Sequence, residues 1–172
     1  MAIGLRRRGV RVTLKSALAT DGQSGEPYDV LVVDEFGRLR TLYGAADVAY
    51  IGASLMPVTA MRGGHNPLEP LAHGIVPLFG PHMRFWESVT QRLRDAWPAI
   101  EVDSPHALGE RVVQVLHGYA PIADIQRVGE TLVEQSRGAI ERTAAFLRDH
   151  LGLDGATTRV ASAEPQPVFV PR

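Results

Sequence analysis

The residues of this chain that are best suited to chemistry lie in one short run, residues 62–69, RGGHNPLE. Arg62 can donate two parallel hydrogen bonds to a phosphate, and free backbone amides at the start of a helix attract an anion. Gly63 and Gly64 have no Cβ, so the backbone there can approach a ligand closely. Glu69, one turn further on, can accept hydrogen bonds from the vicinal hydroxyls of a sugar. These residues together predict a site for a nucleotide or a sugar phosphate.

The same run also has a purely structural interpretation. Asn66 is a favourable N-cap, Pro67 suits the first helical position, and Glu69 follows the cap by three residues. That spacing is a capping box, which needs no ligand to explain it. The glycine pair is the part that capping leaves unexplained. Spacing alone therefore leaves both interpretations open.

Two further turns that follow predicted strands add candidate residues. Gly37 could open a helix whose amides hold a phosphate, although a strand-ending aspartate followed by glycine is common. Ser54 could donate to a ligand oxygen, but ordinary packing of its loop is the favoured interpretation. His82 follows a rigid Gly-Pro turn and lies close to Arg84 at the next helix start, where it could meet an anionic group or serve as a cap.

Composition excludes several classes of protein. The chain has 172 residues, 45% of them hydrophobic, and a formal net charge of −1, which fits a domain with a real core and not a general nucleic-acid binder. It has no cysteine, and its six histidines show no HExxH spacing, so no metal site is expected. The P-loop lysine, the Gly-x-Ser-x-Gly elbow and the GxGxxG fingerprint are also missing from the sequence. We therefore expect no cofactor and disfavour a nicotinamide dehydrogenase.

The elements that would position these turns alternate between strands and helices. Continuous apolar runs predict parallel strands buried on both faces. The predicted strands are residues 10–16, 29–34, 47–54, 75–80 and 99–103. The predicted helices are residues 1–9, 37–46, 66–74, 84–96, 104–118, capped by Ser104, and 121–150, with a break expected near Gly138. The pattern indicates the α/β class, with a Rossmann-like parallel sheet flanked by helices. Ligands of such sheets bind beyond the carboxyl ends of the strands, where the three turns lie.

The boundaries and the cellular location follow from composition as expectations. Residues 1–150 are predicted to form one domain, and residues 151–172 a disordered tail, because the tail is rich in Pro, Ala and Thr and has no period. The N-terminus lacks the apolar segment of a signal peptide, and no run approaches the roughly 18 apolar residues of a membrane span. A cytoplasmic location is expected.

The segment from Val30 to Glu87 resembles the C-terminal half of the 3-deoxy-D-manno-octulosonic acid (Kdo) transferases of lipopolysaccharide synthesis. The run RGGHNPLEP followed by FGPH carries the resemblance, which extends less specifically over residues 10–150. It implies one half of a GT-B glycosyltransferase, in which this half holds the donor, CMP-Kdo. An N-terminal domain would bind the lipid A precursor at the membrane and supply an acidic base. Transfer would be inverting and independent of a metal.

The resemblance also implies roles for individual residues. The Gly37 turn and the segment around Ser54 would face the phosphate and the Kdo unit. Asn66 and Glu69 would line the nucleotide pocket, and Glu69 would accept the ribose hydroxyls. The floor of the pocket would be formed by Arg62, Gly63, Gly64 and His65. The assembled enzyme would lie at the inner face of the inner membrane.

The chain departs from the family pattern in ways that keep alternatives open. The family usually has Gly-Gly-Ser-Leu, and here Ala53 stands at the second position. The family also usually has Gly-Glu-Leu, and here Arg38 stands in place of the glutamate. An acceptor domain and its base are not in the sequence, so a fragment, a truncated reading frame or a subunit with a separately encoded N-terminal domain are all consistent with it. The alternative function is a non-catalytic or degenerate nucleotide-binding or partner-docking module. A GT-B sugar epimerase is disfavoured.

Overall fold

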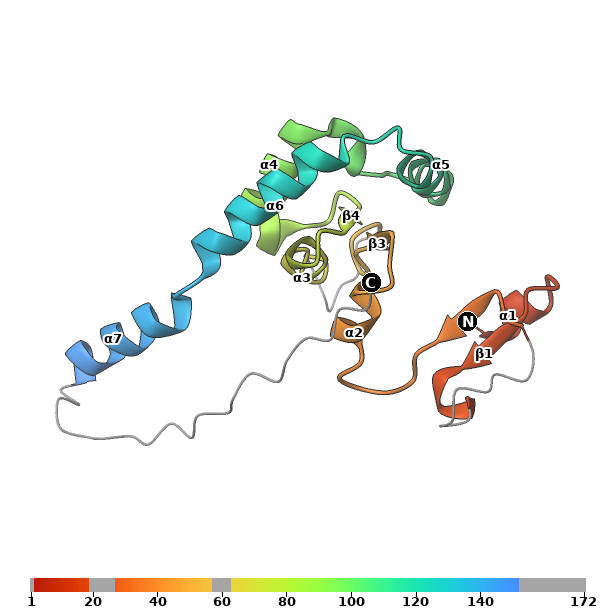
Figure 1. The fold of residues 1–172 in the computed structure, drawn as a ribbon, viewed down its shortest axis with the longest axis horizontal. Coiled ribbons are helices and arrows are strands. Elements are labelled where there is room, and N and C mark those ends of the chain that lie inside the picture. The colour runs from red at the N-terminus through yellow and green to blue at the C-terminus, as the bar shows by residue number, and fades with distance from the viewer. Residues whose placement is uncertain (1, 19–26, 57–62, 152–172) are drawn as a thin grey trace. The chain divides into compact units, whose positions relative to one another are not determined.

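A computed structural model describes residues 2–18, 27–56 and 63–151 of the chain (Figure 1). The chain divides between Ala45 and Ala46 into two compact units. We refer to them as the first unit and the second unit. The predicted single domain over residues 1–150 stays a prediction, and the predicted disorder of the tail falls on residues 152–172, outside those that the structure describes.

The first unit is built around a parallel pair of strands, β1 (Val12–Leu14) and β2 (Val30–Val32). Val12 is paired with Val30, and Leu14 with Val32. The first unit also contains two short helices, α1 (Ala2–Arg6), which packs against β1, and α2 (Leu39–Tyr43), and a 3-10 turn, η1 (Lys15–Ala17). β1 and β2 lie within the predicted strands 10–16 and 29–34 and are shorter than predicted.

Both ends of this strand pair are held by a carboxylate. At one end Asp29 accepts hydrogen bonds from the Arg11 side chain, the nearer at 2.5 Å, and from the Arg11 backbone amide. At the other end Asp34 accepts from the amide and the hydroxyl of Ser16, at 3.0 and 2.5 Å. The hydrogen bonds from Arg11 lower the pKa of Asp29 to about 2, and those from Ser16 lower the pKa of Asp34. Each strand end is thus stabilised when its carboxylate is ionised.

The second unit repeats the parallel pairing with β3 (Val48–Tyr50) and β4 (Val76–Leu78), joined by a crossover that contains α3 (Leu68–Ala72). After β4, a single parallel bridge links Phe79 with Glu101. The remaining elements are η2 (Arg84–Trp86), α4 (Glu87–Ala96), η3 (Pro98–Ile100), α5 (Pro105–Leu116), α6 (Ile122–Ser136) and α7 (Ala139–Leu151). Parallel strands flanked by helices confirm the predicted α/β class.

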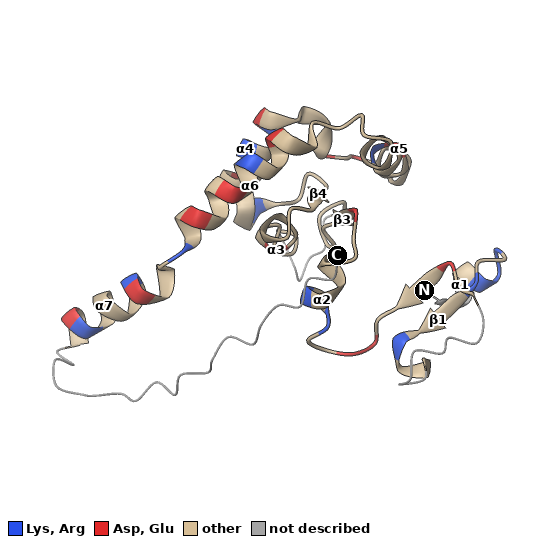
Figure 2. Ribbon diagram, in the orientation of Figure 1, with Lys and Arg blue, Asp and Glu red and all other residues tan. Residues whose placement is uncertain are grey.

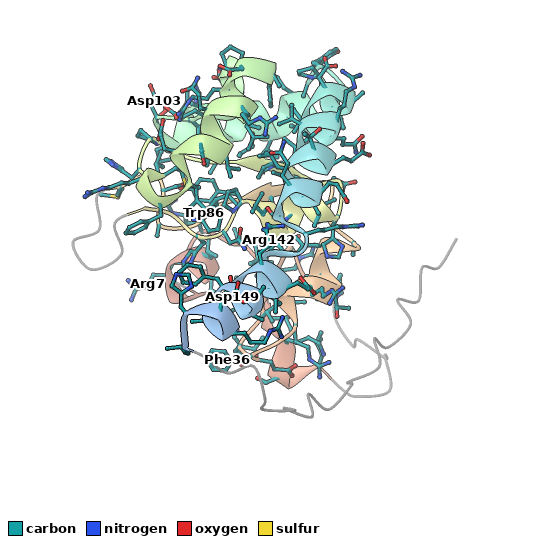
Figure 3. All side chains as sticks on the ribbon, turned by 90° about the vertical axis from the view of Figure 1, so that its left-hand side faces the viewer. Arg7, Phe36, Trp86, Asp103, Arg142 and Asp149 are labelled. Carbon is teal, nitrogen blue, oxygen red and sulfur yellow. The ribbon has the colours of Figure 1, made fainter. Side chains whose placement is uncertain are left out.

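The core of the second unit lies between β4 and the helices around it. Leu78, Phe79, Leu93, Ile100 and Ile125 are fully buried there. Helix α6 packs against both α3 and α4, while α5 packs against β3 and β4. Trp86, at the start of α4, is partly buried against the same core (Figure 3). Acidic and basic residues are spaced along α6 and α7 (Figure 2), and those of α6 are all exposed, so they mark its solvent side.

Several expectations about local structure are confirmed. The long C-terminal helix breaks where glycine predicted it, because Arg137 is extended and Gly138 has φ 72° between α6 and α7. Ser104 caps α5 by accepting a hydrogen bond from the amide of Ala107 at 3.2 Å. Both features depend on residues that lie next to one another in the sequence.

Other expectations are wrong. The predicted strand at 99–103 is instead a 3-10 turn, Pro98–Ile100, followed by the one bridge at Glu101, because proline fixes the backbone at the first position of the turn. Strand β2 is only half-buried, and β3 ends on the exposed Tyr50. Among the described residues each of these strands pairs with one other strand, so burial on both faces is reached by β4 alone.

Candidate functional site

The turns that follow β3 and β4 lie together, as expected for the carboxyl ends of parallel strands. Tyr50 and Leu78 are paired at the ends of the two strands. The amide of His82 donates to the carbonyl of Ser54 at 2.9 Å, which joins the turn after β4 to the turn after β3. The loop before α3 joins the same cluster through the amide of His65, which donates to the carbonyl of Gly52 at 3.1 Å. Three segments distant in sequence therefore meet at this edge.

Ser54 lies at the centre of this cluster and is fully buried. Its hydroxyl donates to the carbonyl of Ile51 at 2.5 Å and accepts from the amide of Gly80 at 2.8 Å. The hydroxyl thereby satisfies a buried amide that would otherwise have no partner. This agrees with the favoured interpretation of Ser54 as a packing residue. A contact between Ser54 and a ligand stays a prediction.

The glycine pair before α3 is fitted against the protein's own side chains. A Cβ on Gly63 would lie 2.3 Å from a ring carbon of Phe85, and one on Gly64 would lie 2.1 Å from the sulfur of Met83. Both glycines also have positive φ, at 145° and 66°, where other residues are strained. We expected the missing Cβ atoms to leave room for a ligand, but this space is filled from within. Their backbone role in a pocket floor stays a prediction.

Two further positions in this cluster were not identified from the sequence as tightly constrained. A Cβ on Gly80 would lie 2.4 Å from the carbonyl oxygen of Ser54 and within 2.6 Å of the Leu55 backbone. Ala53 has φ 59° and is the one non-glycine residue with positive φ among the described residues. The signal for Ala53 was available, because the related family usually has glycine at this position.

Asn66 and Glu69 are brought together, although not as the predicted capping box. Helix α3 begins at Leu68, so it is shorter than the predicted helix at 66–74. The side-chain oxygen of Asn66 accepts from the amide of Leu68 at 2.9 Å, and its side-chain nitrogen donates to Oε1 of Glu69 at 3.3 Å. Glu69 therefore contacts the side chain of Asn66 and not its backbone, because Pro67, and not Asn66, directly precedes the helix.

The solvent side of the cluster carries the remaining candidates. Glu69 and His65 are exposed, and Asn66 and His82 are half-buried. Phe85 is 75% exposed even though the edge of its ring lies against Gly63. Arg62 lies outside the described residues. A carboxylate, an imidazole and an aromatic side chain are thus exposed to solvent on the segments that meet here.

Gly37 belongs to the first unit. It has φ 78°, and a Cβ added to it would meet no atom within 4 Å. Helix α2 follows without a side-chain cap, and Arg38 pairs with Glu35 at 3.0 Å. Phe36 beside it is fully exposed (Figure 3). Its surroundings are open, and its role as a phosphate cradle stays a prediction.

Two other kinds of feature are not found among the described residues. No group of three or more His, Asp or Glu side chains among them could hold a metal ion. None of the helices that the structure describes is both long and apolar enough to cross a membrane.

Comparison with known proteins gives consistent matches. The 3-deoxy-D-manno-octulosonic acid transferase of Haemophilus influenzae is 30% identical over 134 residues, which cover 77% of this chain and 30% of that protein. The transferase of Chlamydia muridarum is 32% identical over 72% of this chain and 28% of its own length. The chain is homologous to the Kdo transferases. The Bordetella pertussis member of the family extends the match to 88% of the chain, at 28% identity. No family model matches the chain.

The fold agrees with this family. The structure superimposes on the C-terminal CMP-Kdo binding domain of WaaA from Acinetobacter baumannii with a TM-score of 0.62 and 19% identity, over 75% of this chain and 64% of that domain. The likeness identifies the fold as that of a GT-B half, as the sequence indicated. The chain spans about a third of the length of the Kdo transferases that it matches.

Proposed function

We propose that this chain is the donor-binding part of a Kdo transferase and holds CMP-Kdo at the turns that follow β3 and β4. The homology over most of the chain to Kdo transferases carries the proposal. An acceptor domain would present the lipid A precursor and supply the acidic base. The assembled enzyme would work at the inner face of the inner membrane, and this part of it would be cytoplasmic.

Glu69 is the residue proposed to recognise the ribose. Among the described residues its carboxylate has one hydrogen-bond partner, Asn66, which occupies Oε1. Oε2 is then free to accept hydrogen bonds from vicinal hydroxyls, and the side chain is exposed to a ligand. Asn66 is itself fixed by the amide of Leu68, so it orients the carboxylate before the ligand arrives. Preorganisation of this kind lowers the cost of binding.

The proposed catalytic contribution of this chain is electrostatic. The acceptor hydroxyl attacks the anomeric carbon of Kdo while the bond to the phosphate oxygen of CMP breaks, and the base in the acceptor domain takes the hydroxyl proton. Negative charge then grows on the departing phosphate. Arg62 and the backbone amides around Gly63 and Gly64 are proposed to stabilise that charge. This scheme is inverting and requires no metal.

Calorimetry with CMP tests the proposal on the full chain. We expect wild-type protein to bind CMP and Glu69→Ala to bind it at least tenfold more weakly, which corresponds to about 1.4 kcal/mol. The expected loss of folding stability is small, about 0.5 kcal/mol, because the bond to Asn66 is exposed and long. Glu130→Ala, which removes an exposed glutamate of α6, is the matched control. If Glu69→Ala and Glu130→Ala bound CMP with equal affinity, the proposed contact of Glu69 with the ribose would be wrong.

A second candidate function is a non-catalytic nucleotide-binding or partner-docking module. The observation that favours it is the filled interior of the candidate site, where Ser54 bonds to backbone and the glycine pair packs on Met83 and Phe85. Addition of an acceptor domain from a relative would separate the two functions. Kdo transfer in that mixture supports the transferase, whereas CMP binding without transfer supports the module.

A further inference from the structure

Phe85 has an unusual position for a large apolar side chain. The two residues that end its turn are anchored in the second unit, since Met83 is 1% exposed and Trp86 is packed against the core. The amide of Trp86 donates to the carbonyl of Met83 at 2.8 Å and closes the turn between them. Phe85 lies inside this closed turn, yet 75% of it is exposed. The turn therefore holds an aromatic ring in solvent on a firm support.

The ring is also held from the side of the loop before α3. A Cβ on Gly63 would lie 2.3 Å from one ring carbon of Phe85 and 3.0 Å from the next, so the ring edge lies directly over the glycine backbone. Packing on Gly63 explains why the ring is fixed but uses only one edge of it. Burial alone does not account for a phenylalanine that is three-quarters exposed, because a smaller side chain would cover the same backbone.

The position of this ring relative to Glu69 suggests what the exposed part contacts. Gly63 precedes Asn66 by three residues, so the two lie at most about 10 Å apart. Asn66 holds Glu69 by a direct hydrogen bond. In a cytidylate the base and the vicinal hydroxyls are attached to the same ribose, so a ligand held by Glu69 must place its base close to this loop. An uncharged aromatic face suits a base and does not suit the phosphate.

We infer that Phe85 is the stacking platform for the cytosine base of the donor. The inference rests on the proposed function, because it takes the ligand of this site to be a cytidylate. Stacking of a base on an aromatic side chain tolerates exposure on one side and needs a ring that is already fixed. Phe85 would thus set the position of the nucleotide, while Glu69 contacts its ribose.

Proton NMR of CMP with the full chain tests the inference by the chemical shifts of the base protons. Because a proton over an aromatic ring is shielded, the H5 and H6 resonances of the bound cytosine should move upfield in wild-type protein. Phe85→Leu keeps an apolar side chain against Gly63 but has no ring, so it should lose the upfield shift and bind CMP roughly five- to hundredfold more weakly. Phe85→Tyr keeps a ring and should retain both properties.

Controls separate this inference from the proposed function. Phe146→Leu removes an exposed ring from α7 and should change neither the affinity for CMP nor the shifts. Wild-type protein that binds CMP without an upfield shift of H5 and H6 would overturn the platform while leaving the proposed function intact, and so would Phe85→Leu with unchanged affinity. Wild-type protein that fails to bind CMP would overturn the proposed function and the platform with it. The wild-type shifts decide the question even if Phe85→Leu does not fold.

Discussion

The turn at Gly37 and the turns of the second unit are similar in sequence and different in structure. Each follows a predicted strand and contains glycine beside candidate ligand residues. Around Gly37 a Cβ would meet no atom within 4 Å, whereas around Gly63, Gly64 and Gly80 it would meet the protein's own atoms at 2.1–2.4 Å. Glycine at a strand end can therefore leave open space or permit tight interior packing, and the surrounding chain decides between the two.

Replacement of Gly80 by alanine should give the largest effect, because its Cβ would collide with backbone atoms of Ser54 and Leu55 that cannot move aside. We expect Gly80→Ala to lower the free energy of unfolding by about 3 kcal/mol. Urea unfolding followed by tryptophan fluorescence measures this, since both tryptophans of the chain, Trp86 and Trp97, belong to the second unit.

The matched substitution Gly37→Ala completes this comparison. It places alanine at φ 78° in open space, so it carries only the backbone strain of about 1–2 kcal/mol and should leave the fluorescence transition of the second unit in place. Equal shifts of that transition in the two variants would contradict the difference between the turns.

Replacement of Ala53 by glycine should act in the opposite direction. Alanine at φ 59° is strained by about 1–2 kcal/mol, and glycine removes that strain but costs about 0.5–1 kcal/mol in backbone entropy. Ala53→Gly should thus raise the stability of the second unit by about 0.5–1 kcal/mol in the same urea experiment. A loss of stability would show that the strain at Ala53 is not relieved by glycine.

Acidification should give the smallest effect, and it should be confined to the first unit. The pKa of Asp29 is lowered to about 2 from 3.8, so the stability that its ionised form provides is complete above about pH 4 and is lost as the pH falls towards 2. The amide of Val30 donates to the carbonyl of Arg11. Its protection from hydrogen exchange, measured relative to a free amide at the same pH, should fall over that range.

Asp29→Asn provides the control for the acid effect. It lacks the ionisable group, so the protection of the Val30 amide should be low already at pH 5 and change less between pH 4 and 2 than in the wild type. If wild-type exchange at Val30 were unaffected by acid, the strand end would not depend on the bond between Arg11 and Asp29.

The parts of the structure that the sequence predicted well are local or carried by the family resemblance. The cap at Ser104 and the break at Gly138 involve neighbouring residues, and the resemblance predicted the fold and the family. The packing of Phe85 and Met83 into the space beside Gly63 and Gly64 could not be predicted. Those two residues follow some 20 positions later and meet the glycines only after the strands align. The bridge at Glu101 was mistaken for a strand because a short apolar run does not show how many partners it has.

The most direct test of the account is an NMR titration of the isotope-labelled chain with CMP. We predict saturable shifts for the backbone amides of Gly63, Gly64, His65, Asn66 and Glu69, with the amides of Val30–Val32 unchanged. That result would place the cytidylate on the loop before α3. Saturating CMP that leaves residues 63–69 unshifted would contradict the central claim that this loop and Glu69 form the donor site.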